Sequence, residues 1–367
     1  MDIGGGSLSE AMRRKLSDIR KRIDGLDRVI VEALSERAKL SLEAGRLKQG
    51  SGFHAFAPPR EEEIIERIVS RLSGALPPGS ARSIYREILS ASRLLQQPTT
   101  IAYMGPRLSP AHHASVQRFG SGARYLPYAD LKDVFSDVQK AKLHFGLVPV
   151  EHSAEGVYNN TLDMFLDSDL LICSEVWVPV SYALVSKART HRGVKTLRGT
   201  RDAVSQSSVW LASNLPHLLV RETPTMESAV RACVRSLDTA AVATPFAADE
   251  FGLRVLADRI EDNPFTRVRF FVIGEIECEP TGKDKTCLAF AIPNVPGSLV
   301  KCLSAFSEGK VNLTMIQSRP TTHGGADDIF FVDVEGHQAE PRLAAALGEL
   351  KKRASFVRLL GSYPKSR

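Results

Sequence analysis

Three basic side chains in the first fifty residues have types and spacings that could bind a small anion. Arg37 and Lys48 lie eleven residues apart in a segment without proline. If the segment is helical, both side chains share one face about 16 Å apart along the axis and could reach one ligand. Arg20 lies seventeen residues before Arg37 and is rotated off that face, so it would serve a different pocket unless a second copy of the helix runs antiparallel. Taken alone, such charges are usual on a helix surface.

The segment that must position these cations has the apolar periodicity of one long helix. Steps of three and four separate its apolar residues, which are Leu16, Ile19, Ile23, Leu26, Ile30 and Leu34. This pattern predicts a helix from about 12 to 48, long enough to indicate a coiled coil or a helical dimer. Shorter helices are predicted at 60–72 and 81–97, separated by Pro77-Pro78-Gly79. The first hundred residues are therefore expected to be all-α.

The residues of this segment also resemble a known family. The matching string consists of Ile19-Arg20, Ile23-Asp24, Leu26-Asp27, Arg37, Ala44-Gly45, Lys48, Pro59-Arg60-Glu61, Ser92 and Gln96. Over residues 16–97 it resembles the all-helical chorismate mutases. The resemblance implies a domain at 8–97, a homodimer, and conversion of chorismate to prephenate. That rearrangement is unimolecular and pericyclic, so it requires no cofactor and no metal, only a held reactive conformer and stabilisation of charge on the ether oxygen.

The resemblance assigns roles to seven catalytic residues. Arg37 and the partner subunit's Arg20 would clamp the carboxylates by bidentate pairing. Lys48 and Gln96 would face the ether oxygen. The other three are Ser92, which would touch a carboxylate, Glu61, which would take the ring hydroxyl, and Arg60, which would support the site. One departure is Ala57, which stands where some relatives have an aspartate against that hydroxyl, so Glu61 would have to suffice alone.

The pattern changes after Gln97-Pro98. Short apolar strands at 99–103, 145–150 and 240–242 alternate with helical stretches such as 226–235, which predicts an α/β domain with largely parallel sheets. A polar stretch at 279–285 is predicted to be a linker. Beyond it, a strand at 287–292, a helix at 299–307, strands near 311–316 and 328–334, and a helix at 340–352 follow the order β-α-β-β-α-β of a ferredoxin-like domain.

The middle segment resembles prephenate dehydratase over residues 99–276. The matching strings are Ala102-Tyr103-Met104-Gly105-Pro106, Val148-Pro149-Val150-Glu151, Ser153, Glu155-Gly156, Asn159, Thr161-Leu162-Asp163, Asp262-Asn263-Pro264 and Arg269-Phe270. The resemblance implies a two-lobed α/β fold like that of periplasmic binding proteins, with prephenate bound in the cleft between the lobes. The expected site residues are Ser109, Glu151, His152, Ser153, Gln206, Val268, Arg269 and Phe270.

Several of these positions depart from the family pattern. The family assigns proton donation to the threonine of a Thr-Arg-Phe motif, which here reads Val268-Arg269-Phe270. Valine keeps the shape of threonine but has no hydroxyl, so it cannot donate a proton. Thr266 would lie roughly 7 Å along an extended chain. His152 and Gly199 replace the usual asparagine and serine, and the Gly-Pro-Glu-Gly-Thr-Phe loop of the family reads Gly-Pro-Arg-Leu-Ser-Pro at 105–110.

Three readings of the middle domain remain open from these changes. In the first, the domain has lost its catalytic activity and only binds a ligand or supports its neighbouring domains. In the second, it dehydrates prephenate with His152 as the proton donor. In the third, it carries out another prephenate reaction, such as decarboxylation without aromatisation. A wider alternative is a regulatory binding protein in which all three domains bind ligands or partners. The complete mutase set argues against that alternative for the first domain, and nothing comparable does so for the second.

The last segment resembles an ACT regulatory domain over residues 284–365. Its marks are Asn294-Val295-Pro296-Gly297-Ser298-Leu299 and Gln317-Ser318-Arg319-Pro320. The resemblance implies an effector site of Gly297, Ser298, Leu299, Gln317, Ser318, Arg319 and Pro320 for phenylalanine or another aromatic amino acid. Phenylalanine-binding relatives have glutamate where Gln317 stands. The missing charge leaves a ligand ammonium without its ionic partner, so weak phenylalanine inhibition is expected.

Composition bounds the class of protein. The 367 residues are 43% hydrophobic and 25% charged, as in globular proteins. The net charge of +6 arises from 48 basic and 42 acidic residues without a long run of one sign, so neither nucleic acid nor membrane is expected as a partner. No membrane span or signal peptide is predicted, and the five scattered cysteines contain no CxxC pair. A cytoplasmic protein with reduced thiols is expected, and the resemblances to the three families imply an enzyme of phenylalanine biosynthesis.

Overall fold

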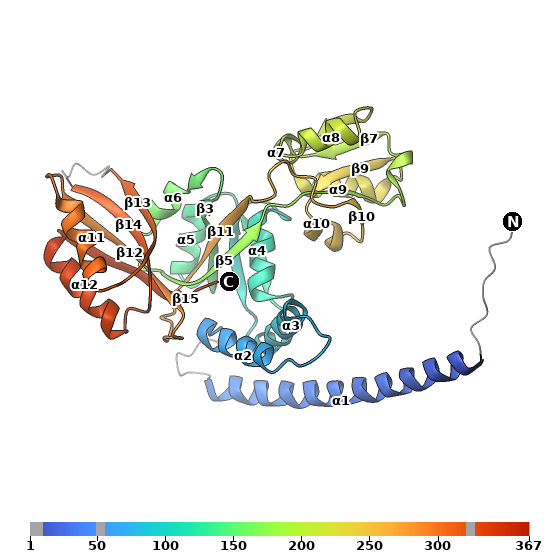
Figure 1. Ribbon diagram of the computed structural model, residues 1–367, viewed down its shortest axis with the longest axis horizontal. Helices are drawn as coiled ribbons and strands as arrows, with labels where there is room; N and C mark the ends of the chain where they lie inside the picture. Colours follow the sequence, from blue (N-terminus) through green and yellow to red (C-terminus); the bar gives the residue numbers. More distant parts are fainter. Residues whose placement is uncertain (1–9, 49–55, 321–326, 367) are drawn as a thin grey trace.

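The computed structural model describes residues 10–48, 56–320 and 327–366. Its first part is helical, with α1 (Glu10–Lys48), α2 (Pro58–Ser70) and α3 (Pro78–Gln96). All three predicted helices are confirmed. Prolines start the last two helices, Pro58-Pro59 in α2 and Pro78 in α3, because proline at the first helical positions loses no hydrogen bond there. In Figure 1, α1 lies below the rest of the molecule, and its N-terminal half extends beyond α2 and α3.

The apolar face of α1 is largely exposed in the single chain. Its exposed apolar residues include Ile19, Ile23, Leu26, Val29, Ile30 and Val31, and Leu26 is 64% exposed. The less exposed positions lie near the C-terminal end, at residues 37, 38, 41, 44, 45 and 48, where α1 packs on α3. The long helix therefore buries only one end of its length within its own chain.

The middle domain has two lobes, each built on a mixed sheet. The first has the strand order β2-β1-β3-β11-β5, with β4 beside β3. Its elements are β1 (Thr100–Met104), α4 (Pro110–Phe119), β2 (Arg124–Tyr128), α5 (Leu131–Gln139), β3 (Phe145–His152), β4 (Gly156–Val157), α6 (Asn159–Met164), β5 (Leu171–Pro179) and β11 (Arg267–Gly274). Strand β1 pairs in parallel with β2 and β3, whereas β11 runs antiparallel to both β3 and β5.

The second lobe has the strand order β10-β6-β9-β7-β8. Its elements are β6 (Ala183–Ser186), the 3-10 turn η1 (His191–Gly193), β7 (Thr196–Gly199), α7 (Arg201–Ser205), α8 (Ser208–Asn214), β8 (Leu219–Glu222), α9 (Met226–Arg235), β9 (Thr239–Ala243), α10 (Pro245–Glu250) and β10 (Arg254–Ala257). Only β7 with β8 and β7 with β9 are parallel. The expectation of largely parallel sheets is therefore wrong for both lobes, because strands returning from the other lobe pair antiparallel.

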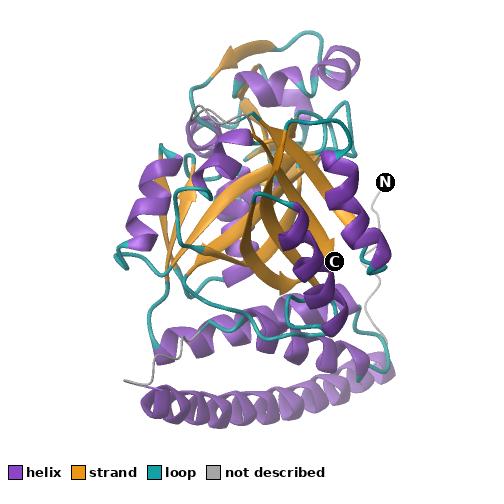
Figure 2. Ribbon diagram, turned by 90° about the vertical axis from the view of Figure 1, so that its left-hand side faces the viewer, coloured by secondary structure: helices purple, strands orange, loops and turns teal. Residues whose placement is uncertain are grey.

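The C-terminal domain confirms the predicted β-α-β-β-α-β order. It consists of β12 (Asp284–Pro293), α11 (Ser298–Glu308), β13 (Leu313–Arg319), β14 (Asp327–Glu335), α12 (Pro341–Arg353) and β15 (Phe356–Pro364). Its antiparallel sheet has the order β13-β14-β12-β15. Strand β12 begins at Asp284, so the linker ends earlier than the predicted 285. Figure 2 shows the N-terminal helices below the strands of the other two domains.

Two buried clusters join the domains. One contains Phe271 and Ile273 of β11 together with Cys287, Phe331 and Tyr363 of the C-terminal sheet. The other contains Phe56, just before α2, with Phe119 and Phe145 of the first lobe and residues of the second lobe such as Leu184. Apolar burial is the main stabilising term in folding, so these shared clusters hold the three domains together.

Candidate functional site

The seam between α1 and α3 brings predicted catalytic residues together. The Nη1 atom of Arg37 donates to the Ser92 hydroxyl and to the Ile88 carbonyl at 3.4 Å, and Ser92 Oγ itself donates to that carbonyl at 2.8 Å. Guanidinium and hydroxyl therefore lie at the same turn of α3. This arrangement leaves further guanidinium N–H groups of Arg37 that can bind an anion.

One turn further along α3, Gln96 lies against α1. A Cβ atom added to Gly45 would be 3.0 Å from Gln96 Cγ, so glycine is needed for this close approach. The buried Oε1 atom of Gln96 accepts no hydrogen bond from any residue that the structure describes. Lys48, half-buried, follows Gly45 by three residues and shares its face of α1. Cations and an amide thus line one seam.

Glu61 of α2 is buried and ion-paired to two arginines. Its Oε1 atom binds Arg93 of α3, and its Oε2 atom lies 3.2 Å from Arg118 Nη1 on α4 of the middle domain. Neither arginine was expected at the site, since nothing in the helical periodicity distinguishes them from surface arginines. Because Arg93 follows Ser92 directly, Glu61 approaches the turn of α3 that Arg37 approaches from α1.

Two predicted catalytic residues lie outside this arrangement in the single chain. Arg60 is exposed and pairs with Glu63 at 2.5 Å on its own helix. Arg20 is exposed on α1, and seventeen residues of helix place it about 25 Å from Arg37 along the axis. Within a single chain, Arg20 therefore does not reach the seam at Arg37.

In the middle domain, β11 divides the predicted site residues between two faces of its sheet. Val268 pairs with His152, and Arg269 pairs with Glu151, so each pair shares a face. Val268 and Phe270 are buried in an apolar cluster with Val178 of β5. A hydroxyl at position 268 would enter this apolar face, whereas the present valine completes it.

The other predicted polar groups of the cleft make local contacts. His152 is buried, and its Nδ1 atom accepts N–H groups of Ala154 at 3.3 Å and Glu155 at 3.1 Å, so a single ring proton belongs on Nε2. Ser153 Oγ accepts the Arg267 N–H at 3.0 Å. Ser109 caps α4, and the Gln206 carbonyl accepts the Asp262 N–H at 2.6 Å.

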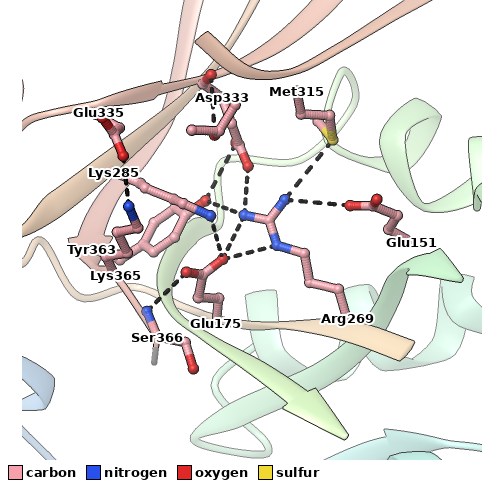
Figure 3. Close-up of polar contacts among 11 residues, drawn as sticks. Glu151, Glu175, Arg269, Lys285, Met315, Asp333, Glu335, Tyr363, Lys365 and Ser366 are labelled. Carbon is pink, nitrogen blue, oxygen red and sulfur yellow. Dashed lines mark hydrogen bonds and ion pairs between the residues drawn. The ribbon is translucent and has the colours of Figure 1, made fainter. Parts of the chain in front are cut away.

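Arg269, predicted to belong to the substrate site, places its guanidinium in a buried ionic cluster shared with the C-terminal domain. The residue is 1% exposed. Figure 3 shows Arg269 between Glu175 and Asp333, at 2.6 and 2.5 Å, with Tyr363 at 3.1 Å. Glu151 lies 3.9 Å away, and Lys285 pairs with Glu175 at 3.1 Å. The side chain therefore joins β11 to the C-terminal sheet.

The charge states of this cluster follow from its surroundings. Burial by itself lowers the pKa of Arg269, but the charged Asp333 and Glu175 carboxylates outweigh it, so the pKa lies above the ordinary value. Burial also raises the pKa of Tyr363 well above its usual range. The phenol therefore stays neutral and donates to Asp333 Oδ1 at 3.3 Å. Arg269 thus remains charged and paired with carboxylates from both domains.

The loop after β1, whose residues 105–110 depart from the family pattern, joins the two lobes. Leu108 has a φ of 67°, which is uncommon for a residue with a side chain, and it is fully buried in the second-lobe cluster with Val230. Arg107 pairs with Glu250 of α10 at 2.8 Å. In the sequence, the sign of this contact is Leu108, which stands where the family loop has glycine.

The predicted effector segments meet at one end of the C-terminal sheet. Gly297, with a φ of 87°, begins α11 after β12 ends, and β14 starts beside that end of β12 and pairs with the end of β13. The other predicted effector residues flank the Gly297 turn and the end of β13, namely Ser298, Leu299, Ser318 and Pro320. Gln317 donates to the Ser318 carbonyl at 3.3 Å, and Arg319 Nε donates to Asp163 of α6 at 2.9 Å. The effector strand therefore contacts the middle domain directly.

Among the residues that the structure describes, there is neither a cluster that could hold a metal ion nor a membrane-spanning helix. Residues 10–48, 56–320 and 327–366 contain no group of three or more His, Cys, Asp or Glu side chains that could hold a metal ion. Within the same ranges, no helix is both long and apolar enough to cross a membrane.

The three domains together define a class of protein. Family models described as chorismate mutase type II, prephenate dehydratase and ACT domain match residues 19–97, 101–277 and 288–352. The class is that of a chorismate mutase fused to a dehydratase-type domain and an ACT domain. The "Bifunctional chorismate mutase/prephenate dehydratase" of Aquifex aeolicus is 39% identical over 96% of this chain and 98% of its own length. The same-named protein of Pseudomonas aeruginosa is 33% identical over 96% and 98%.

This chain therefore belongs to the family of bifunctional chorismate mutase/prephenate dehydratases, and its helical domain is a chorismate mutase. Among solved structures, the prephenate dehydratase of Arthrobacter aurescens in complex with L-Phe is 29% identical, with a TM-score of 0.63, covering 73% of this chain and 90% of its own. The prephenate dehydratase of Staphylococcus aureus, 22% identical with a TM-score of 0.63 over 72% and 100%, supports the fold.

Proposed function

We propose that chorismate binds in the seam between α1 and α3. The observation that carries the proposal is the buried Oε1 atom of Gln96, which has no hydrogen-bond partner among the described residues and lies on the same seam as Arg37 and Lys48. Buried polar atoms are rarely left unpaired. An ether oxygen only accepts hydrogen bonds, so the Gln96 amide is turned about its last torsion in the complex and presents an N–H at this position. Lys48 then adds positive charge where negative charge builds in the transition state, which is a large source of rate enhancement.

The site is completed by a second copy of the chain. In an antiparallel pair of α1 helices centred between residues 28 and 29, the partner subunit's Arg20 is level with Arg37, because the two lie equally far from that centre. The apolar residues around this centre, Leu26, Val29 and Ile30, are exposed in the single chain, and pairing would bury them. Arg20 and Arg37 would then clamp the two carboxylates, with Ser92 beside Arg37, Glu61 at the ring hydroxyl and Arg60 in support.

For the middle domain, we propose that prephenate binds but that dehydration is slow. The support is the apolar face around Val268, the arrangement of His152 with Nδ1 accepting two backbone N–H groups, and the engagement of Arg269 with the C-terminal domain. A positioned acid commonly contributes about two to four orders of magnitude to a rate. Without one, loss of the ring hydroxyl lacks its usual assistance.

One product analysis tests both proposals. Purified full-length protein is supplied with chorismate, and the products are separated by chromatography and identified by NMR. We expect rapid prephenate formation with little phenylpyruvate above the uncatalysed rate. Rapid phenylpyruvate formation would contradict the proposal for the middle domain, and a non-aromatic decarboxylated acid would assign it the alternative chemistry. Failure to form prephenate would contradict the assignment of the mutase site.

The C-terminal domain is proposed to bind an aromatic amino acid at the end of its sheet. The support is the meeting of the Gly297 turn and the Gln317–Pro320 segment, and the structure of the Arthrobacter aurescens relative in complex with L-Phe. We also propose a cytoplasmic location, since all five cysteines are buried and free, as in reducing compartments.

A further inference from the structure

The start of α2 is anchored in the middle domain. Phe56 is buried and its ring centroid lies 4.6 Å from that of Phe119 and 4.9 Å from that of Phe145. Arg118 of α4 lies over the Phe56 ring at 4.7 Å. The helix that bears Glu61 therefore begins against the first lobe of the middle domain, and Arg118 of α4 covers the Phe56 ring at its start.

Arg118 is held at both ends of its guanidinium. Its Nε atom donates to Ser174 Oγ of β5 at 2.9 Å, and its Nη1 atom lies 3.2 Å from Glu61 Oε2. Only 12% of its side chain is exposed. Planar guanidinium groups bind two partners in a fixed geometry, which a flexible ammonium does not reproduce. Ser174 thus fixes the direction in which Arg118 meets the carboxylate.

The two oxygens of Glu61 are held by different domains. Arg93 of α3 binds Oε1 and also donates to the Phe119 carbonyl, whereas Arg118 of the middle domain binds Oε2. A carboxylate has about four acceptor positions, so two remain for a ligand hydroxyl. Because Ala57 provides no carboxylate of its own, the orientation of Glu61 is set by these two arginines.

We propose that Arg118 is a positioning residue of the chorismate mutase site, acting through Glu61. The proposal rests on the proposed role of Glu61 at the ring hydroxyl. Under this proposal, chorismate turnover depends on a contact with the dehydratase-type domain, although that domain does not touch chorismate itself. Loss of Arg118 leaves Glu61 fixed at one oxygen only, and small misplacements of a substrate-binding group reduce rates strongly.

The test measures mutase kcat and KM of the full chain for Arg118→Ala and Arg118→Lys. We expect Arg118→Ala to lower kcat/KM by roughly ten- to hundredfold. Two further variants should have kcat/KM values between those of Arg118→Ala and the unaltered protein. These are Arg118→Lys and Ser174→Ala, the second of which removes the hydrogen-bond partner of Arg118 Nε. The matched control is Glu87→Ala, because Glu87 accepts from Ser121 N–H at 3.1 Å in the same interdomain contact without touching Glu61. The control should stay within about twofold.

A double-mutant cycle separates positioning from a general structural effect. If Arg118 acts through Glu61, Arg118→Ala should add less than about twofold to the loss already caused by Glu61→Gln. Unchanged kinetics in Arg118→Ala, an equal loss in Glu87→Ala, or fully multiplicative losses in the cycle would overturn the proposal. A normal rate in Glu61→Gln would instead show that the assignment of Glu61 itself is wrong. That outcome is seen in the single variant Glu61→Gln, so it can be told apart from a failure of the Arg118 proposal, which appears in the Arg118 variants.

Discussion

At the scale of single residues, the alternation along β11 determines what each side chain can do. Val268 and Arg269 are neighbours in the motif that resembles the dehydratase family, yet they occupy opposite faces of the sheet. The sequence shows that position 268 lacks the hydroxyl of the family motif. It could not place Arg269, because the ion partners Glu175 and Asp333 are 94 and 64 residues away along the chain. Strand periodicity alone would have separated the two side chains.

Val268→Thr restores the hydroxyl of the family motif, and we expect only partial dehydratase activity from it. The new hydroxyl enters a buried apolar cluster, and His152 and Gly199 still differ from the family pattern. Phenylpyruvate formation from prephenate should rise by less than about tenfold, well below the usual contribution of a positioned acid. The measurement follows phenylpyruvate absorbance, with Val268→Ala as the control. Full dehydratase activity in Val268→Thr would show that the other changes are neutral.

Lys48→Ala should nearly abolish mutase turnover while leaving the protein folded. Loss of a charge that stabilises the transition state typically costs about 3 kcal/mol or more, which is over a hundredfold in rate. Lys39→Ala is the control, because Lys39 lies on the same helix, where its exposed side chain pairs with the exposed Glu36 at 3.2 Å. Chorismate consumption and circular dichroism are compared. Near-normal turnover in Lys48→Ala would refute the site assignment.

At the scale of elements, periodicity was sufficient for helices and insufficient for sheets. The apolar repeat gave the length of α1 within about two residues, because 3.6-residue periodicity is a local property. Strand direction is not local. Strand β11 follows the whole second lobe before it returns between β3 and β5, so its antiparallel pairing could not be read from short apolar runs.

Leu26→Asp should dissociate the proposed homodimer and lower mutase activity together. A charge at the centre of the paired α1 helices would be desolvated on association, which is costly, and loss of the pair removes the partner subunit's Arg20 from the site. Light scattering after size exclusion, with activity measured on the same sample, checks this. Leu219→Asp serves as the control, because Leu219 is an exposed apolar residue of β8 in the second lobe. A fully active monomer would contradict the shared site.

Gln317→Glu should tighten phenylalanine binding by roughly five- to twentyfold, since charge-assisted hydrogen bonds are about twice as strong as neutral ones. Gln317 is half-buried beside Arg319, whose partner Asp163 already balances that charge. Calorimetric titration compares the unaltered protein, Gln317→Glu and Gln317→Ala, which removes the amide without adding charge. Tight binding to the unaltered protein would contradict the expected weak response to phenylalanine.

At the scale of the whole molecule, the domain order followed from the sequence but the contacts between domains did not. The three segments matched their families because each motif is contained within one domain. Phe56, Arg118 and Asp333 contribute to contacts between domains, and such partners are distant in sequence. The middle domain therefore contacts the mutase through Glu61 and the effector domain through Arg269, so that each of its neighbours is attached by a buried ionic contact.

Asp333→Asn tests how strongly the effector domain is attached through this ionic cluster. The change keeps the size of the side chain but leaves Arg269 with one fewer anion in a buried site, and breaking a buried ion pair commonly costs about 3–5 kcal/mol. The control is Asp169→Asn, which removes an ion pair between the same two domains, at 3.0 Å from Arg358, where the Asp169 side chain is 94% exposed. Exposed pairs contribute about 0–1 kcal/mol. Urea unfolding is followed by tryptophan fluorescence in a Trp210→Phe background, so that the signal comes from Trp177, which lies 5.7 Å from the Arg269 guanidinium. The transition should occur at lower urea concentration in Asp333→Asn and stay unchanged in Asp169→Asn. Equal midpoints in the two variants would mean that the apolar cluster of Phe271, Phe331 and Tyr363, rather than the charges, holds the effector domain in place.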